Sequence, residues 1–276
     1  MKLIAPSYYQ RFRCIAGKCR HSCCKGWEID IDPVSLERFK RLGVGSISEE
    51  GTPHFILREG DVCPHLRSDG LCQLICDHGE DVLCDICRDH PRFRNFWTGF
   101  AEVGLGLSCE EAAGIILSEK EPLRLVRIGL CDEDGVQISA GLGQDGDLSD
   151  VEGGGPAFDP AESEPDFPED EAWLWELRES MLLKAVMMKD PMAARLYEYL
   201  VFRHLADALY DGRLEGRIGF IEHAFETVTG LWSGSPDKSF EALAGIARHW
   251  SEETEYNEEK KDALIERFES SAHTLV

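Results

Sequence analysis

The chain has 276 residues, of which 43% are hydrophobic and 29% are charged, and its formal net charge is −23. This composition supplies enough apolar side chains for a folded core, so it excludes a fully disordered chain and a small disulfide-stabilised scaffold. The acidic excess argues against nucleic acid as a partner, because an acidic surface repels a polyanion. No run of about 18 apolar residues occurs, so we expect no membrane span, and the early Pro6 argues against a signal peptide.

The first third of the chain predicts short elements joined by loops. Residues 27–31 alternate apolar and acidic side chains, which is typical of a half-buried strand. Asp32 followed by Pro33 predicts a helix that begins there and ends near Leu42, because the carboxylate can cap the first turn and proline suits its first position.

Two further patterns follow before the acidic middle of the chain. Residues 55–57 and 71–74 are predicted to pair as strands, with a turn at Asp69-Gly70 between them. Ser108 is predicted to cap another helix, because two glutamates and an apolar run follow it.

Residues 132–171 contain fourteen acidic residues and no lysine or arginine, and they are rich in glycine and proline. Such a segment cannot bury enough apolar surface to offset the entropy of ordering it, so we predict an acidic linker or mobile insertion. Gly141–Gly146 matches the dinucleotide-binding pattern G-x-G-x-x-G. No helical pattern follows it, so we interpret it as a chance match.

The last third of the chain predicts helices. Apolar residues recur at helical spacing in five segments, 173–188, 192–210, 217–231, 240–250 and 261–268. We interpret their apolar and aromatic side chains as core. The predicted fold class is α+β, mostly α. It comprises a small cysteine-rich metal-cluster domain of short strands and helices over residues 1–131, the acidic segment 132–171, and an all-α region over residues 172–276.

Cysteines are the most informative residues of the chain. Ten of the eleven lie between Cys14 and Cys109, and only Cys131 stands outside this range. The odd number and the missing export signal disfavour a secreted disulfide framework. Thiolates this close together repel one another and lose hydration unless a cation binds them. The sequence therefore predicts a metal or iron–sulfur centre, with buried cysteines that bind no metal as the alternative.

The spacing of the cysteines leaves the metal open. Four thiolates suit either Zn²⁺ or a [4Fe–4S] cluster. Zinc sites usually contain paired C-x2-C hooks, and only Cys84 and Cys87 have this spacing. The C-x3-C-x2-C loop of radical enzymes is absent. Cys19 and Cys23 have the spacing of its first two cysteines, but Gly26 occupies the position of the third.

Four separated motifs have a specific order and spacing between residue 8 and about residue 117. The first comprises Tyr8-Tyr9, Phe12–Cys19, Cys23–Trp27 and Ile31-Asp32, and the others are Cys63–Leu66 with Asp69–Cys72, Cys87–Arg92 and Leu107–Ala113. Together they resemble the flagellin lysine-N-methylase family, which is part of a wider group with zinc- or iron-chelating cysteine clusters. This sequence departs from the family's pattern at His65, where the family usually has an aromatic residue, and at Cys76 and Cys84, which are additional thiols.

The resemblance implies a cytoplasmic protein-lysine N-methyltransferase that methylates flagellin. It implies S-adenosylmethionine as the methyl donor and a cysteine-bound [4Fe–4S] cluster, with Zn²⁺ as the alternative. Tyr8 and Tyr9 are implied as candidates for the site that receives the amine. The implied metal ligands are eight cysteines, namely Cys14, Cys19, Cys23, Cys24, Cys63, Cys72, Cys87 and Cys109.

Two other functions fit the same residues. The chain could serve as a non-enzymatic zinc or iron–sulfur binding module whose helices dock a partner, or as a redox sensor whose thiols form reversible disulfides. Of the three, only the methyltransferase is expected to bind S-adenosylmethionine. The sequence indicates neither a catalytic base, nor a donor pocket, nor an oligomeric state.

Overall fold

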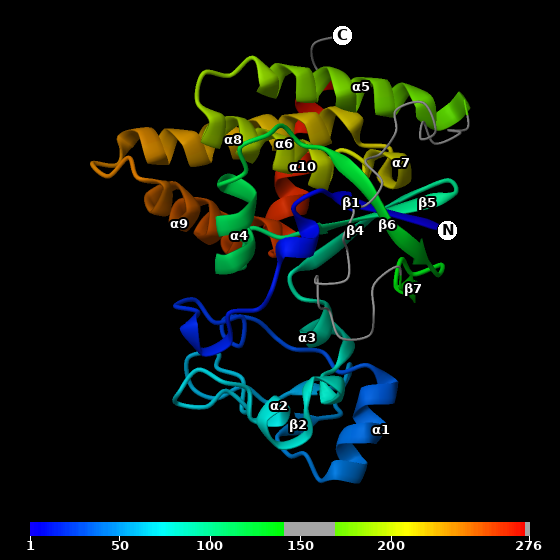
Figure 1. Cartoon of the computed structure of the whole chain (residues 1–276), viewed down its shortest axis with the longest axis vertical. Helices are drawn as coiled ribbons and strands as arrows, with labels where there is room; N and C mark the ends of the chain where they lie inside the picture. Colours follow the sequence, from blue (N-terminus) through cyan, green and yellow to red (C-terminus); the bar gives the residue numbers. More distant parts are fainter. Residues whose placement is uncertain (141–168, 274–276) are drawn as a thin grey trace, which may run out of the picture. The chain divides into compact units, whose positions relative to one another are not determined.

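The computed structural model describes residues 1–140 and 169–273, and it confirms an α+β fold that is mostly helical (Figure 1). The chain forms two compact units, and each has an apolar cluster of its own. Unit 1 contains residues 1–12, 92–108 and 112–276, and unit 2 contains residues 13–91 and 109–111. Gly141–Gly146 and most of the predicted acidic segment lie outside the described residues.

A five-stranded mixed sheet organises unit 1. Its strands are β1 (Lys2–Pro6), β4 (Arg92–Trp97), β5 (Phe100–Leu105), β6 (Leu125–Cys131) and β7 (Gln137–Ala140), in the order β4-β5-β1-β6-β7. β1 is parallel to β5, and every other neighbouring pair is antiparallel. The sheet therefore shares a unit with the helices of the last third, whereas the sequence analysis grouped residues 1–131 together.

Helices make up most of the remainder of unit 1. They are α4 (Glu110–Leu117), α5 (Glu169–Val186), α6 (Pro191–His204), α7 (Ala208–Asp211), α8 (Leu214–Gly234), α9 (Phe240–Trp250) and α10 (Glu258–His273), with a π-helical turn over Ser251–Glu255. Figure 1 shows α5, α6 and α8 running alongside one another. The five predicted helical segments are confirmed, except that the segment 192–210 is divided after His204. No helix among residues 1–140 and 169–273 has both the length and the apolar character needed to cross a bilayer.

Buried polar contacts attach two of these helices to the sheet. Arg178 of α5 donates to the Glu102 carboxylate of β5 at 2.8 Å, and both side chains are at most 1% exposed. Asn95 of β4 donates to the Phe202 carbonyl of α6 at 2.6 Å. Because a buried charge is costly unless it is paired, these contacts favour one placement of α5 and α6 on the sheet.

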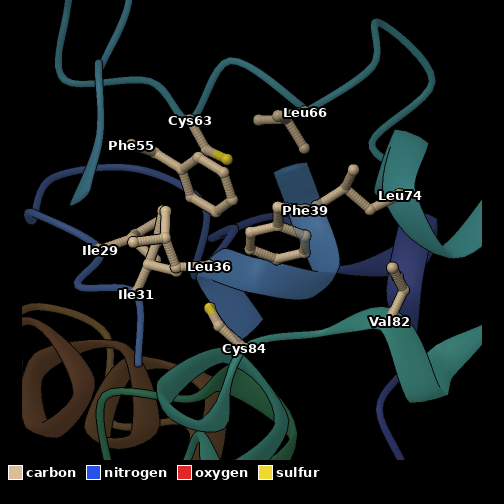
Figure 2. Close-up of a cluster of buried hydrophobic side chains, with 10 residues drawn as sticks. All are labelled: Ile29, Ile31, Leu36, Phe39, Phe55, Cys63, Leu66, Leu74, Val82 and Cys84. Atoms are coloured by element: carbon tan, nitrogen blue, oxygen red, sulfur yellow. The ribbon is translucent and has the colours of Figure 1, made fainter. Parts of the chain in front are cut away.

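Unit 2 consists of short elements around a small core. They are α1 (Pro33–Leu42), β2 (Ile47–Ser48), β3 (His54–Phe55), α2 (Gln73–His78) and α3 (Asp85–Asp89), with 3₁₀ turns at 16–18 and 80–82. Figure 2 shows the core, in which Cys63 and Cys84 lie among apolar side chains such as Phe39 and Phe55. Two cysteines thus form part of the packed interior of this unit.

The helix predicted after Asp32 is confirmed. The Asp32 carboxylate accepts a hydrogen bond from the Ser35 amide at 2.8 Å, and Pro33 occupies the first turn. Gly43 ends the helix with a φ of 70°, a left-handed conformation that glycine adopts without a steric penalty.

The strand predictions for unit 2 are only partly correct. Residues 27–31 show the expected alternation, with Ile29 and Ile31 buried, but they form no regular strand. They contact the chain before and within β3 through two backbone hydrogen bonds, from Ile31 to Pro53 and from Phe55 to Ile29. The predicted pairing of 55–57 with 71–74 is wrong, because β3 pairs with β2 and α2 begins at Gln73.

Two local signals of the sequence had different outcomes. The turn at Asp69-Gly70 is present, since the Gly70 amide bonds to the Arg67 carbonyl at 3.1 Å. The cap predicted at Ser108 is wrong, because α4 begins at Glu110 and the Ser108 hydroxyl is buried without a hydrogen-bond partner among the described residues.

Candidate metal centre

Ten of the eleven cysteines belong to unit 2, and all eleven carry free thiols. The exception is Cys131, which is 1% exposed at the end of β6 in unit 1 and packs in that unit's apolar cluster. The clustering expected from the sequence is therefore also a clustering in space, because one compact unit of the fold contains every cysteine between Cys14 and Cys109.

Backbone pairing brings Cys24 beside Cys63. The Cys63 amide donates to the Cys24 carbonyl at 2.9 Å, and the Gly26 amide donates to the Asp61 carbonyl at 2.9 Å. Arg58 donates to the Cys63 carbonyl at 2.9 Å, which fixes the loop that follows Cys63. Two cysteines that are 39 positions apart in the sequence are thus held together by backbone contacts, without any metal.

The thiols of Cys23, Cys24 and Cys63 interact with one another. Hydrogen bonds from the Cys23 and Cys63 thiols lower the pKa of Cys24, because they stabilise its thiolate. The same hydrogen bonds, followed by burial, raise the pKa values of Cys23 and Cys63. The arrangement therefore stabilises a thiolate at Cys24, and a thiolate is the form of cysteine that binds metals.

Cys84 and Cys87 form a second pair, at the start of α3. The Cys87 thiol lowers the pKa of Cys84 by hydrogen bonding to it, and the same bond raises the pKa of Cys87. Cys87 also interacts electrostatically with Cys24 and Cys63. The C-x2-C hook of the sequence therefore lies at the same centre as the first group of thiols.

Asp32 positions this hook. One carboxylate oxygen accepts from the Ser35 amide of α1, and the other accepts from the Asp85 amide of α3 at 3.0 Å. These hydrogen bonds hold the pKa of Asp32 below its usual value even though burial opposes them. A single carboxylate therefore caps α1 and links it to the turn that begins with Cys84.

Cys72 and Cys76 lie at helix α2, Cys72 immediately before it and Cys76 within it. Cys72 precedes α2, and its pKa is raised by burial while the amides of the first turn lower it. It interacts electrostatically with both Cys24 and Cys76. Cys76 is exposed one helical turn further along, with its amide bonded to the Cys72 carbonyl at 3.1 Å.

Cys14, Cys19 and Cys109 are connected to the other thiols through interactions with Cys23 or with one another. Cys23 interacts electrostatically with Cys14 and Cys109, and Cys14 interacts with Cys19. The Cys19 thiol donates to the Glu110 carboxylate at 3.6 Å, and burial raises its pKa. Each of the eight predicted ligands therefore interacts electrostatically with at least one other cysteine of unit 2.

Two histidines lie beside the thiols. His65 packs edge-on against Phe55 with ring centroids 4.8 Å apart, and burial lowers its pKa. His90 lies 6.0 Å from the Trp27 ring and interacts electrostatically with Cys24. His65, at which this sequence departs from the pattern of the resemblance, therefore packs as a half-buried ring against Phe55.

The chemistry of this set suits a soft or borderline metal, because thiolates are preferred ligands of zinc and of iron–sulfur clusters. Proximity alone does not make a closed site. Within the part of the chain that the structure describes, no group of three or more His, Cys, Asp or Glu side chains is arranged to hold one metal ion. The eight ligands predicted from the sequence accordingly remain predictions. Cys84, which was not among them, joins Cys87 in space, and the C-x2-C spacing was its sequence signal.

The two tyrosines singled out by the resemblance lie in unit 1. Tyr8 is 6% exposed and lies two positions after the end of β1. Tyr9 accepts a hydrogen bond from Arg92 at 2.9 Å, and the Arg92 guanidinium also lies over the Tyr9 and Phe12 rings. Tyr9 therefore has a structural partner.

Curated proteins of known name are similar to part of this chain. A lysine-N-methylase of Salmonella typhimurium (strain LT2) is 27% identical over 134 residues, which are 44% of this chain and 33% of that protein. A lysine-N-methylase of Salmonella choleraesuis is 26% identical over 134 residues, which are again 44% of this chain and 33% of that protein. A flagellar biosynthetic protein FliU of Salmonella muenchen is 25% identical, over 44% of this chain and 79% of that protein.

These similarities confirm the resemblance as a distant one. The matched part of the chain spans about a third of the length of the two lysine-N-methylases. No family model matches the chain, and no solved structure matches it.

Proposed function

We propose that this protein is a protein-lysine N-methyltransferase that acts on flagellin in the cytoplasm and uses S-adenosylmethionine as the methyl donor. The observation that carries the proposal is the distant similarity to proteins named lysine-N-methylase. The gathering of ten thiols in one compact unit supports it, because the sequence motifs that resemble the family are built around these cysteines.

We further propose that this thiol set holds a [4Fe–4S] cluster, with Zn²⁺ as the alternative. Cys24 with Cys23, Cys63, Cys72 and Cys87 would provide the ligands, because these thiols interact with one another. When bound, such a centre would cross-link the loops of unit 2, and an iron with an open position could hold the amino-carboxylate end of the donor.

The reaction itself is a displacement that needs no redox step. The lysine nitrogen attacks the methyl carbon, the N–C bond forms as the S–C bond breaks, and S-adenosylhomocysteine leaves. The attacking amine must be neutral, so the protein must desolvate the lysine or provide a base that accepts its proton. Alignment of the nitrogen, the methyl carbon and the sulfur then supplies much of the acceleration.

The test is methylation of purified flagellin by protein prepared without oxygen. With S-adenosylmethionine present, intact-mass spectrometry should show flagellin gaining mass in CH₂ increments, and peptide fragmentation should locate them on lysines. Cys24→Ala should abolish the increments, whereas Cys131→Ala should retain them, because Cys131 belongs to unit 1 and is not one of the ten cysteines of unit 2. Unchanged flagellin mass with a protein that retains its metal, together with no thermal shift from the donor, would contradict the proposal and favour a binding module.

A further inference from the structure

Unit 1 has an apolar groove at the end of α8. The groove is lined by six residues, Leu231, Ile246, His249, Trp250, Glu253 and Thr254. They come from α8, from α9 and from the π-helical turn that follows α9. Figure 1 shows α9 turning back beside the end of α8. The groove has a volume of about 330 Å³ and is open to solvent, and all three elements belong to unit 1.

Apolar side chains make up most of the lining surface. Trp250 is 8% exposed and packs on Phe220 of α8 with ring centroids 5.9 Å apart, so its ring is a fixed part of the groove. Leu231 is 57% exposed and Ile246 is half-buried. An apolar side chain that enters the groove removes this surface from water, which is favourable. The lining therefore suits an apolar anchor residue of a partner.

The π-helical turn gives the groove a wall that is already in place. Its first and last residues, Ser251 and Glu255, are at most 2% exposed. The Glu255 carboxylate accepts from the Ser251 hydroxyl and lies 2.6 Å from His204 Nε2 of α6. Glu253 and Thr254, which lie between these two anchored residues, line the groove. Turns of this rare kind are frequent at functional sites, and this one is fixed from inside the unit.

The wall formed by this turn is acidic. Among the described residues that line the groove, Glu253 carries a carboxylate and none is a lysine or an arginine. Glu253 pairs with Lys260 at 3.0 Å, but both side chains are more than half exposed, so this pair contributes little. Residues 249–262 contain six acidic and two basic residues. The charge beside the groove therefore favours a basic partner over a neutral or acidic one.

We propose that the groove docks an amphipathic helix of a partner protein, with an apolar residue in the groove and lysine or arginine side chains beside the acidic segment 249–262. The walls are helical, so their backbone groups are bonded within the helices and offer no edge to an extended strand. A helix satisfies its own backbone, and its apolar stripe presents a row of side chains to a groove of this kind.

Other occupants fit less well. Nucleic acid and anionic lipid surfaces would be repelled by the acidic segment. A second copy of this chain, docked through the same patch about a two-fold axis, would bring two acidic segments into one interface.

The test is binding of three labelled helical peptides to the full chain, measured by fluorescence anisotropy. One has leucines at helical spacing and lysines elsewhere, the second replaces the lysines by glutamates, and the third replaces the leucines by serines. We expect only the leucine–lysine peptide to bind. Leu231→Ser should weaken it about tenfold, because apolar burial is lost. Glu253→Gln should weaken it about two- to fivefold and reduce its dependence on salt.

Leu183→Ser is the matched control, because Leu183 is 64% exposed on α5 and the substitution leaves the charge unchanged. Leu231→Ser and Leu183→Ser should both retain the melting temperature of the wild type, since both positions are exposed. Failure of the leucine–lysine peptide to bind, equal binding of either other peptide, unchanged affinity in Leu231→Ser, or an equal loss in Leu183→Ser would each overturn the assignment. Self-association of the chain that Leu231→Ser abolishes would also overturn it, because the groove would then receive a second copy. The assay contains neither donor nor flagellin, so its outcome is independent of the proposed methyl transfer.

Discussion

Replacement of Glu198 by glutamine should change how the stability of unit 1 depends on pH. The Glu198 side chain is 3% exposed, and burial raises its pKa from 4.5 to about 7, although Arg195 and the Leu123 amide oppose this rise. Between these two pH values the folded state keeps a proton that the unfolded state releases. Folding stability from this group is therefore fully present below pH 4.5 and is lost as the pH rises through 7.

The magnitude follows from the two pKa values. One pKa unit corresponds to 1.36 kcal/mol, so a rise from 4.5 to about 7 makes the folded protein about 2–3 kcal/mol less stable at pH 8 than at pH 5 through this group alone. Glutamine cannot ionise but can still accept from the Leu123 amide. The difference in unfolding free energy between wild type and Glu198→Gln should therefore move by that amount across this range.

Urea unfolding followed by the helical circular dichroism signal at several pH values measures this difference. Taking the difference between the two proteins removes the titration of other groups, including His204, whose pKa is lowered by burial and whose contribution has the opposite sign. Glu226→Gln, on the exposed side of α8, should follow the wild type throughout. Parallel pH profiles for wild type and Glu198→Gln would refute the reasoning.

Three further predictions concern stability. If unit 2 holds the proposed metal centre, Cys87→Ser should release it and unfold the unit, since structural metal binding contributes about 10 kcal/mol; metal analysis and limited proteolysis check this, and retention of both metal and fold would contradict it. Asp32→Ala should cost about 1–2 kcal/mol, because it removes the cap of α1 and the bond to the Asp85 amide; in urea unfolding Asp32→Asn should recover only part of this loss, because its single amide oxygen can accept one of the two hydrogen bonds. Glu255→Gln should cost about 3 kcal/mol at neutral pH by leaving Arg203 and His204 without their buried carboxylate. Because the pKa of Glu255 is lowered to about 2, this stabilisation is present above pH 4.5 and is lost as the pH falls towards 2, so the two proteins should converge in acid.

Local signals predicted the elements whose stability is decided locally. Helix α1 was predicted to begin at Asp32-Pro33 and to end near Leu42, and the prediction is confirmed, because Asp32 and Pro33 act within the first turn of the helix. The helices of the last third were predicted from the helical spacing of their apolar residues, which is also a local property of the sequence. Residues 27–31 show the limit of this approach, because alternation fixed which side chains are buried but not which segment they pair with.

Long-range placement needed the structure. Nothing in the sequence of β1 indicates that it pairs with β5 and β6, which lie about a hundred residues further along the chain. The cysteine unit was predictable from the density of thiols, whereas the pairing of Cys24 with Cys63 depends on backbone contacts between distant loops.

The proposed function depends most on the presence of a metal centre in unit 2, which contains ten of the eleven cysteines. Its direct measurement is the iron, zinc and acid-labile sulfide content of the protein purified without oxygen, together with its visible absorption spectrum. We predict iron and sulfide in equal amounts, about four of each per chain, with broad absorption near 400 nm. Zinc without sulfide would show that the centre is a thiolate zinc site and not an iron–sulfur cluster. A protein that folds with neither metal would contradict the proposal that unit 2 holds a metal centre.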